Sequence, residues 1–244
     1  MNLNIPENTS KNTHNIVESL LLEDKNSKKV LDIPSGAGAF TYRLIRKKIE
    51  VHSADIENIM QIDNPHFMDA DMNQALPYKD SFFDAIVCID GIEHIERPFD
   101  FVRECYRVLK NGGNLIVSTP NIHSLRSRWR WFLTGHHNKC KTPLDEGNVS
   151  PLHHINMISY TEMRYLLHTN GLSIEKVTTN RIKAISYLYL PMIPLAYLAT
   201  KFVFNKEEKN LAQKKRNKMI MKHMFSNPLL FGETMIIKAK CVKD

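Results

Sequence analysis

Residues 30–40 read VLDIPSGAGAF, an apolar run that ends at Asp32 and passes into a short turn containing Gly36 and Gly38. Between a strand and a helix, such a turn lets a ligand approach the backbone closely. The turn lacks the third glycine of a dinucleotide fingerprint, because Thr41 stands at that position. The Asp32 carboxylate would repel a pyrophosphate and attract a cation. The stretch therefore predicts a ligand that carries positive charge.

Two further acidic residues follow where the next two strands are expected to end. Asp55 closes EVHSAD, about twenty residues later, where a carboxylate can accept both hydrogen bonds from a ribose diol. Asp71 follows the next strand and can accept from the amine of a base while Met72 packs on its face. Singly, each acid is an ordinary cap or turn residue. Together, around a GxG turn, they fit an adenosine with a cationic tail.

Strand-like and helical patterns alternate in the first half of the chain. Helical patterns cover residues 40–48 and 97–113, the second stopping at a Gly-Gly pair. Apolar runs of β-type composition lie at residues 28–33, 50–55, 84–89, 114–120, 172–179 and 233–242. The alternation predicts an α/β fold with a mostly parallel sheet and helices on both faces. Such sheets bind ligands at the carboxyl ends of their strands.

The 244 residues, 43% of them hydrophobic, suffice for one domain with insertions. We expect an N-terminal helical segment at 1–27 and a domain at 28–244. Insertions are expected at about 121–150, as a lid, and at about 180–230, between the last two strands. The polar start of the chain has no secretory pattern, so we expect a cytoplasmic protein. The four scattered cysteines indicate reduced thiols.

Four stretches resemble the class I S-adenosylmethionine-dependent methyltransferases over roughly residues 28–120: VLDIPSGAGAF, VHSADI, ADMNQALPYKDSFFDAIVCIDGIEHI and RECYRVLKNGGNLIVSTPN. The resemblance implies a Rossmann-like seven-stranded sheet and S-adenosyl-L-methionine as the cofactor. It places Asp32 near the methionine amine, Asp55 at the ribose and Asp71 at the adenine amine. The complete cofactor set that it implies is Asp32, Ser35, Gly36, Gly38, Asp55, Ile56, Asp71, Met72 and Asp90.

Pro34 departs from the family pattern, which usually has glycine at this position, and Ser35 stands where cysteine is frequent. Proline fixes φ and has no backbone N–H, so one backbone contact to the cofactor is expected to be missing. We expect weaker cofactor binding rather than lost activity, because the two closest-approach glycines remain.

The stretch CIDGIEHIERPFD follows the fourth strand at the mouth of the expected pocket. Asp90, Glu93 and His94 are spaced i, i+3, i+4, which puts them on one side of a helical turn. A hydroxyl acceptor needs a general base or a metal. We predict catalytic roles for His94 and Glu93. The alternatives are a magnesium site formed by Asp90, Glu93 and His94, as in the similar quinone-biosynthesis O-methyltransferases, and acids that only favour a helix start.

A histidine pair, His153 and His154, precedes a helix that Ser159 or Thr161 would begin and Gly171 would end. One of the pair, taken as His154, is predicted to enter the pocket as a third catalytic residue. The alternative is a surface histidine beside a capped helix.

The insertion after the fifth strand alternates arginines with tryptophans. Guanidinium groups and aromatic faces suit an anionic or sugar-bearing substrate, and the alternative is a lid with its own small core. The residues concerned are Arg126, Arg128, Trp129, Arg130 and Trp131.

The insertion before the last strand begins with residues 184–200, AISYLYLPMIPLAYLAT, which are uncharged but interrupted by Pro191 and Pro194. This run is shorter than a membrane-spanning helix requires. Residues 201–222 then carry eight basic and two acidic residues. We predict that residues 184–224 bind an anionic membrane peripherally, at its inner face. The alternative is a helical cap that buries its own apolar face.

These features predict an S-adenosylmethionine-dependent methyltransferase that O-methylates a small molecule, a sugar or a lipid-linked glycan. The alternative is a non-catalytic, membrane-associated scaffold that binds the cofactor. Nucleic-acid methylation is disfavoured, because CIDGIEH stands where amino-group enzymes carry an Asn/Asp-Pro-Pro-aromatic motif, and IPSG offers serine where cytosine C5 chemistry needs cysteine. No pattern indicates an oligomeric state.

Overall fold

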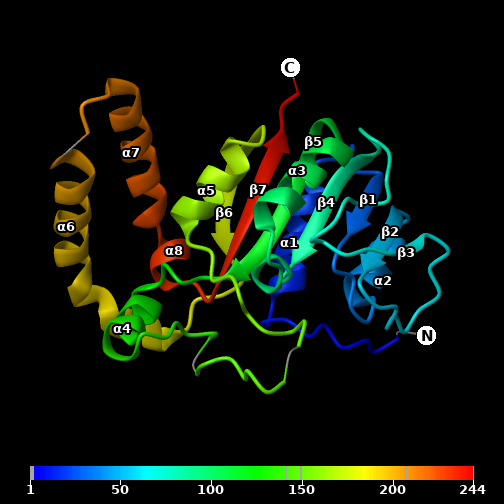
Figure 1. Ribbon diagram of the computed structural model, residues 1–244, viewed down its shortest axis with the longest axis horizontal. Helices are drawn as coiled ribbons and strands as arrows, with labels where there is room; N and C mark the ends of the chain where they lie inside the picture. The colour runs from blue at the N-terminus through cyan, green and yellow to red at the C-terminus, as the bar shows by residue number, and fades with distance from the viewer. Residues whose placement is uncertain (1–2, 141, 149, 207, 244) are drawn as a thin grey trace.

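The computed structural model describes residues 3–140, 142–148, 150–206 and 208–243. A seven-stranded sheet in the order β3-β2-β1-β4-β5-β7-β6 forms the centre of the molecule (Figure 1). Its strands are β1 (Lys29–Asp32), β2 (Glu50–Asp55), β3 (Phe67–Asp69), β4 (Phe83–Ile89), β5 (Leu109–Pro120), β6 (Leu172–Thr179) and β7 (Thr234–Cys241). The helical elements are α1 (Thr13–Leu22), α2 (Ala39–Ile45), η1 (Ile92–His94), α3 (Pro98–Val108), α4 (Leu125–Thr134), α5 (Tyr160–His168), η2 (Ala184–Met192), α6 (Ile193–Lys206), α7 (Leu211–Met224) and α8 (Asn227–Phe231).

The sheet is parallel from β3 to β5, and β7 runs antiparallel to both β5 and β6. The predicted Rossmann-like, mostly parallel fold is confirmed. In the register, Asp32 pairs with Ser53, and Asp55 pairs with Asp69. The ends of β1 and β2 therefore lie side by side, which brings the acids that follow them to one edge of the sheet.

Both faces of the sheet are covered by helices, because the side chains of each buried strand alternate between two cores. Leu31 and Ile86 belong to the core that includes residues of α3 and α5, whereas Val30 and Val87 belong to the core that includes α1 and α2. Strands that are apolar on both faces are typical of parallel sheets.

Helix α3 ends at Val108, so the predicted helix over residues 97–113 is wrong in its last five residues. Residues Leu109 to Gly113 instead begin β5 and bulge against β4, between the pairs Phe83↔Leu109 and Ala85↔Asn114. A side chain at Gly113 would meet the Asp84 carbonyl oxygen at 2.9 Å. The Gly-Gly pair therefore permits a close approach of two strands rather than ending a helix.

Helix α5 begins as predicted at Ser159, which with Glu162 forms a reciprocal capping box. The helix ends at His168, and Gly171 follows in a left-handed turn with φ of +73°. The cap fixes the entry of α5, and with it the preceding histidine pair.

Candidate active site

A cavity of about 420 Å³ opens at the carboxyl ends of β1, β2 and β4. Of the nine predicted cofactor residues, the structure places eight along this cavity: Asp32, Ser35, Gly36, Asp55, Ile56, Asp71, Met72 and Asp90. They come from four separate turns that the parallel register brings together. Their part in cofactor binding stays a prediction.

Asp32 is 1% exposed at the end of β1, and a hydroxyl group of α2 orients its carboxylate. The Thr41 hydroxyl donates to Asp32 Oδ2 at 2.6 Å and lies 2.7 Å from Ser53 Oγ, which accepts from Asn64 Nδ2 at 2.9 Å. Burial raises the pKa of Asp32 to about 7, although the Thr41 hydroxyl opposes the shift. A bound ammonium group would restore the charged form, so this carboxyl fits a cationic ligand.

Thr41 and Ser53 escaped the sequence reasoning as site residues. In the sequence, Thr41 only marks the absence of the third glycine of a dinucleotide fingerprint. In the structure, its hydroxyl orients the Asp32 carboxylate. A small polar residue one helical turn into α2, on the side facing the strand, was the available clue.

Gly36 and Gly38 both adopt left-handed backbone angles, with φ of +51° and +85°. A side chain at Gly38 would meet Met60 Cε at 2.9 Å and Ile62 Cγ1 at 3.1 Å. Gly38 therefore shapes the turn and does not line the cavity among the residues described. The buried Ser35 Oγ lines the cavity and has no hydrogen-bond partner in the described chain, so it is free to bond a ligand.

Asp55 uses both carboxylate oxygens to order backbone turns, and Asp71 uses one. Asp55 accepts the backbone N–H of Gly36 and of Ile56, each at 2.8 Å. Asp71 accepts the N–H of Asn73 at 2.8 Å, which is the Asx turn considered from the sequence. Each carboxylate keeps unused lone pairs, so turn formation and ligand binding are compatible.

Pro34 packs against Gly91, in the loop after β4. A side chain at Gly91 would lie 2.3 Å from Pro34 Cδ, so the proline ring fills the space of that missing Cβ. The proline at position 34, which departs from the family pattern, is thus accommodated by a glycine that it contacts directly, Gly91.

The N-terminal segment covers part of the cavity, which the sequence did not reveal. Pro6, Glu7, Asn8 and Thr9 line it. The Thr9 hydroxyl donates to Asp90, and Glu7 pairs with Arg43 of α2 at 2.9 Å. We call residues 6–9 the strap. A polar stretch ahead of the first helix has no pattern that predicts this position.

The three predicted catalytic residues come together beside the cavity. The His94 and His154 rings meet edge to face with centroids 4.7 Å apart, and donor atoms of Glu93, His94 and His154 lie within 4.8 Å of one another. His94 lines the cavity, and its Nδ1 lies 3.0 Å from the His153 carbonyl oxygen. The histidine pair therefore contributes one ring and one carbonyl.

Glu93 is buried, and neither carboxylate oxygen makes a hydrogen bond of normal geometry within the described chain. Burial, with a smaller effect of the Asp90 charge, raises the pKa of Glu93 to about 8. Burial also lowers the pKa of His94 and of His154 below the usual histidine value. Near neutral pH the cluster therefore holds a protonated carboxyl group and two uncharged imidazoles.

The donor set bears on the predicted magnesium site. Asp90, one of its three predicted ligands, accepts hydroxyl hydrogen bonds from Ser118 and Thr9 instead, and His154 takes its place beside Glu93 and His94. Two imidazoles and one carboxylate suit zinc, manganese or iron better than magnesium. The unpartnered Glu93 oxygens and His154 Nδ1 fit such an ion, which would polarise a bound hydroxyl.

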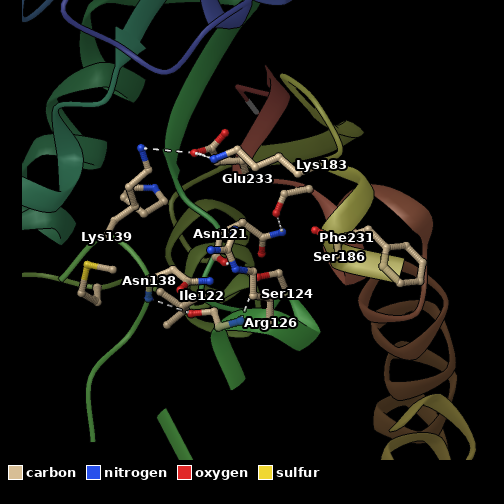
Figure 2. A pocket seen from close by; sticks show the side chains of 14 residues that line it. Asn121, Ile122, Ser124, Arg126, Asn138, Lys139, Lys183, Ser186, Phe231 and Glu233 are labelled. Atoms are coloured by element: carbon tan, nitrogen blue, oxygen red, sulfur yellow. Dashed lines mark hydrogen bonds and ion pairs between the residues drawn. The ribbon is translucent and has the colours of Figure 1, made fainter. Parts of the chain in front are cut away.

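A second, smaller cavity of about 120 Å³ lies where β5 ends and β7 begins (Figure 2). Glu233 binds Lys183 at 2.9 Å and lies 3.6 Å from Lys139, while Arg181 donates to its other oxygen. Burial opposes ionisation, but the hydrogen bonds from Arg181 and Lys183 hold the pKa of Glu233 at about 2. The Lys139 charge also acts on Glu93 and His154, so this wall of the smaller cavity lies within electrostatic range of two predicted catalytic residues.

Asn121 fixes the wall of this smaller cavity. Its Nδ2 donates to the carbonyl oxygens of Leu229 and Gly232, both at 3.0 Å, and to that of Pro228 at 3.2 Å. Asn121, which follows β5, thereby holds α8 and the turn before β7 against the end of β5. A lone asparagine after a strand gave no hint of this role.

Helix α4 lines the smaller cavity through Arg126 and keeps Arg128 against His123 at 2.9 Å. Trp129 and Trp131 are exposed. No described residue of α4 lines the larger cavity, so a lid by α4 over the cofactor pocket is not what the structure shows.

Comparisons with known proteins agree with this geometry. The sequence matches the family "Methyltransferase domain" over residues 31–117. The ubiquinone biosynthesis O-methyltransferase of Proteus mirabilis is 27% identical over 117 residues, covering 43% of this chain and 46% of that protein. The ubiquinone/menaquinone biosynthesis C-methyltransferase UbiE of Pectobacterium atrosepticum is 34% identical over 119 residues, covering 41% and 47%. The match thus spans a little under half of each relative.

A solved S-adenosylmethionine-dependent methyltransferase from Archaeoglobus fulgidus has the same fold, with a TM-score of 0.56 and 19% identity over 93% of this chain and 94% of that one. The domain match over residues 31–117 and the shared fold agree with the predicted resemblance to the class I S-adenosylmethionine-dependent methyltransferases. The predicted class and cofactor are confirmed.

Proposed function

We propose that the chain transfers the methyl group of S-adenosylmethionine to a hydroxyl oxygen of a small or lipid-carried acceptor. S-adenosylmethionine supplies an electrophilic methyl group on a sulfonium. Asp32, Ser35 and the acids after β2 and β3 hold the cofactor in the larger cavity, and the acceptor approaches from the smaller one. The observation that carries the proposal is the position of His94, which lines the larger cavity beside His154 and Glu93.

His94 has the form that a general base needs. Its Nδ1 donates to the His153 carbonyl oxygen, which leaves the lone pair on Nε2 free. Because burial lowers its pKa, the ring is uncharged at neutral pH. His94 Nε2 would take the hydroxyl proton as the acceptor oxygen bonds to the methyl carbon and the bond from that carbon to sulfur breaks. The positive charge would pass from the sulfonium to the imidazolium, and a neutral thioether would leave.

Glu93 and His154 position that base. The two rings fix each other edge to face, and Glu93 anchors the segment before α5 by accepting the Asn156 N–H at its backbone oxygen, at 2.9 Å. Alignment of the reacting atoms contributes up to about 7–11 kcal/mol in favourable systems. A tight histidine pair is therefore more valuable here for geometry than for charge.

Transfer to carbon is the second candidate, favoured by the similarity to UbiE, a C-methyltransferase. The same base would then remove a proton from an acceptor hydroxyl, and the methyl group would be found on a ring carbon. A non-catalytic scaffold is the third candidate, and it predicts cofactor binding without turnover.

The test begins with calorimetric titration of S-adenosylmethionine, followed by turnover with ¹³C-methyl cofactor and a panel of phenols, sugars and lipid-linked glycans. We expect binding, consumption of cofactor and a methyl carbon resonance typical of an ether. A resonance typical of a C-methyl group would replace the proposal by the second candidate. Binding without turnover over the whole panel would favour the scaffold, and no binding would refute all three.

A further inference from the structure

The helical insertion between β6 and β7 exposes an unusual amount of apolar surface. The run from Ala184 to Lys206, which comprises η2 and α6, has 23 residues, and its apolar 18-residue window has a mean hydropathy of 1.3 and no buried residue. Among the described residues it is the one helical run long and apolar enough to cross a membrane. Its exposed large apolar side chains are Ile185, Tyr187, Leu188, Leu190, Leu195, Tyr197, Leu198, Phe202 and Val203.

Helix α6 carries apolar side chains on its outer side as well as on the side that packs against the protein. Its half-buried stripe is Ile193, Ala196, Thr200 and Phe204, whereas Leu195, Leu198 and Val203 point away from it. A helix that is apolar on its outer face as well lacks the polar side that solvent requires. Something apolar therefore covers this face.

The tip of α4 extends the same surface. Helix α4 contacts η2, and both lie at the foot of α6 in Figure 1. Trp129, Trp131, Phe132 and Leu133 are exposed on α4. Tryptophan and tyrosine favour the boundary between water and lipid, where an aromatic ring lies in an environment of mixed polarity. We call α4, η2 and α6 together the apolar face.

Positive charge accompanies the apolar face. Helix α7 carries five basic residues and no acidic one, and α6 carries two more. None of these seven forms an ion pair with a carboxylate elsewhere in the described chain. They are Lys201, Lys206, Lys214, Lys215, Arg216, Lys218 and Lys222. Cations that are not neutralised by a carboxylate match the anionic headgroups of a membrane.

A spanning orientation conflicts with the return of the chain. Helix α7 runs back alongside α6, and Asn217 Nδ2 donates to the Phe204 carbonyl oxygen at 3.2 Å (Figure 1). From α7 the chain enters α8 and then β7, which lies between β5 and the edge strand β6. If α6 crossed the bilayer from this side, α7 would follow it into hydrocarbon with its charges.

We propose that the apolar face and α7 dock this chain on an anionic membrane surface, with α6 lying in the interface rather than across it. The apolar face enters the boundary between headgroups and acyl chains, and the lysines and the arginine bind anionic headgroups. This proposal is independent of the methyl acceptor and of catalysis.

The first experiment is co-sedimentation of the full chain with phosphatidylcholine vesicles, with and without phosphatidylglycerol, at low salt. We expect binding to the mixed vesicles, weaker binding to pure phosphatidylcholine, and release by salt. Failure of the folded chain to bind the mixed vesicles would overturn the proposal. Extraction by alkaline carbonate is expected, and resistance to it would overturn the interfacial orientation.

Two matched substitutions test which surface binds. Val203 on α6 is 66% exposed, and Val242 after β7 is 53% exposed. Val203→Glu is expected to weaken vesicle binding at least tenfold and Val242→Glu to leave it unchanged, with both variants unfolding thermally at the wild-type temperature. Equal binding by the two variants would refute the assignment.

Replacing Lys215, Arg216, Lys218 and Lys222 with glutamine tests the charge. Each removed cation should weaken binding to mixed vesicles by up to about fivefold and leave binding to pure phosphatidylcholine unchanged. Sedimentation velocity tests whether a second copy of the chain covers the apolar face instead. If the wild type forms a dimer that Val203→Glu dissociates, and does not bind vesicles, the proposal is overturned.

Discussion

At the ends of β1 and β4, carboxyl groups are buried among apolar residues, whereas in η2 and α6 leucines, tyrosines and phenylalanines face outward. Asp32 and Glu93 both lie in the interior, with burial raising the pKa of each. Leu195 and Phe202 lie on the outside and are 75% and 65% exposed. Each region inverts the usual distribution, in which polar groups are solvated and apolar groups are packed.

The buried carboxyl groups and the exposed apolar side chains are stabilised by different kinds of ligand. What stabilises each region therefore indicates what binds there. A buried carboxyl group is relieved by a cation or by a proton, which points to a small charged ligand. An exposed apolar face is relieved only by another apolar body. One domain thus combines a site that needs a small cation with a surface that needs something extended.

The largest expected effect separates the two regions by function. His94→Asn should lower kcat by about 10²–10⁴-fold, because the proton acceptor is lost, and leave cofactor affinity and vesicle binding unchanged. Steady-state kinetics with a soluble acceptor would measure it. His66→Asn is the control, since His66 does not line the cavity. Unchanged kcat in His94→Asn would leave alignment alone to explain catalysis.

The next effect has opposite signs in the free and the bound protein. Asp32→Asn should weaken S-adenosylmethionine binding at least tenfold, about 1.4 kcal/mol, because the amine loses its partner. The folded pKa of Asp32 is raised, so its ionisation costs stability as the pH rises from about 4 to about 7. The ligand-free variant should therefore be more stable than wild type at pH 8, as denaturant titration would show. A less stable variant would mean that the hydrogen bond from the Thr41 hydroxyl outweighs the cost of burying the Asp32 charge.

A backbone prediction sharpens the account of the turn. Gly38→Ala combines left-handed strain, about 1–3 kcal/mol, with contact against Met60 and Ile62. Gly135→Ala has the same strain at φ of +70° in open space. The unfolding free energy should fall more for Gly38→Ala, and cofactor binding should weaken only there. Equal losses would show that Met60 and Ile62 move aside.

The smallest effect is a titration. S-adenosylmethionine binding should release a fraction of a proton near pH 7, since Asp32 is partly protonated in the free protein and charged beside an ammonium group. Calorimetry in buffers of different ionisation enthalpy measures this fraction, and Asp32→Asn should abolish it. Release that persists in the variant would assign the proton to another group, with Glu93 the next candidate.

The regular part of the chain was predictable because each of its features is local. Strand composition, the glycines of the first turn and three acids at strand ends all follow from residues close in sequence. The strap was not predictable, since the contact of Thr9 with Asp90 depends on the path of a polar segment with no periodicity. The replacement of Asp90 by His154 in the candidate metal-binding group likewise depends on tertiary packing, which joins residues sixty positions apart.

The strap also sets a condition on turnover. Glu7 is fastened to Arg43, and Thr9 to Asp90, across the mouth of the larger cavity. The used cofactor would lie beneath residues 6–9 and could leave only when these two contacts break. We therefore expect the opening of the strap, rather than methyl transfer itself, to limit the rate of turnover.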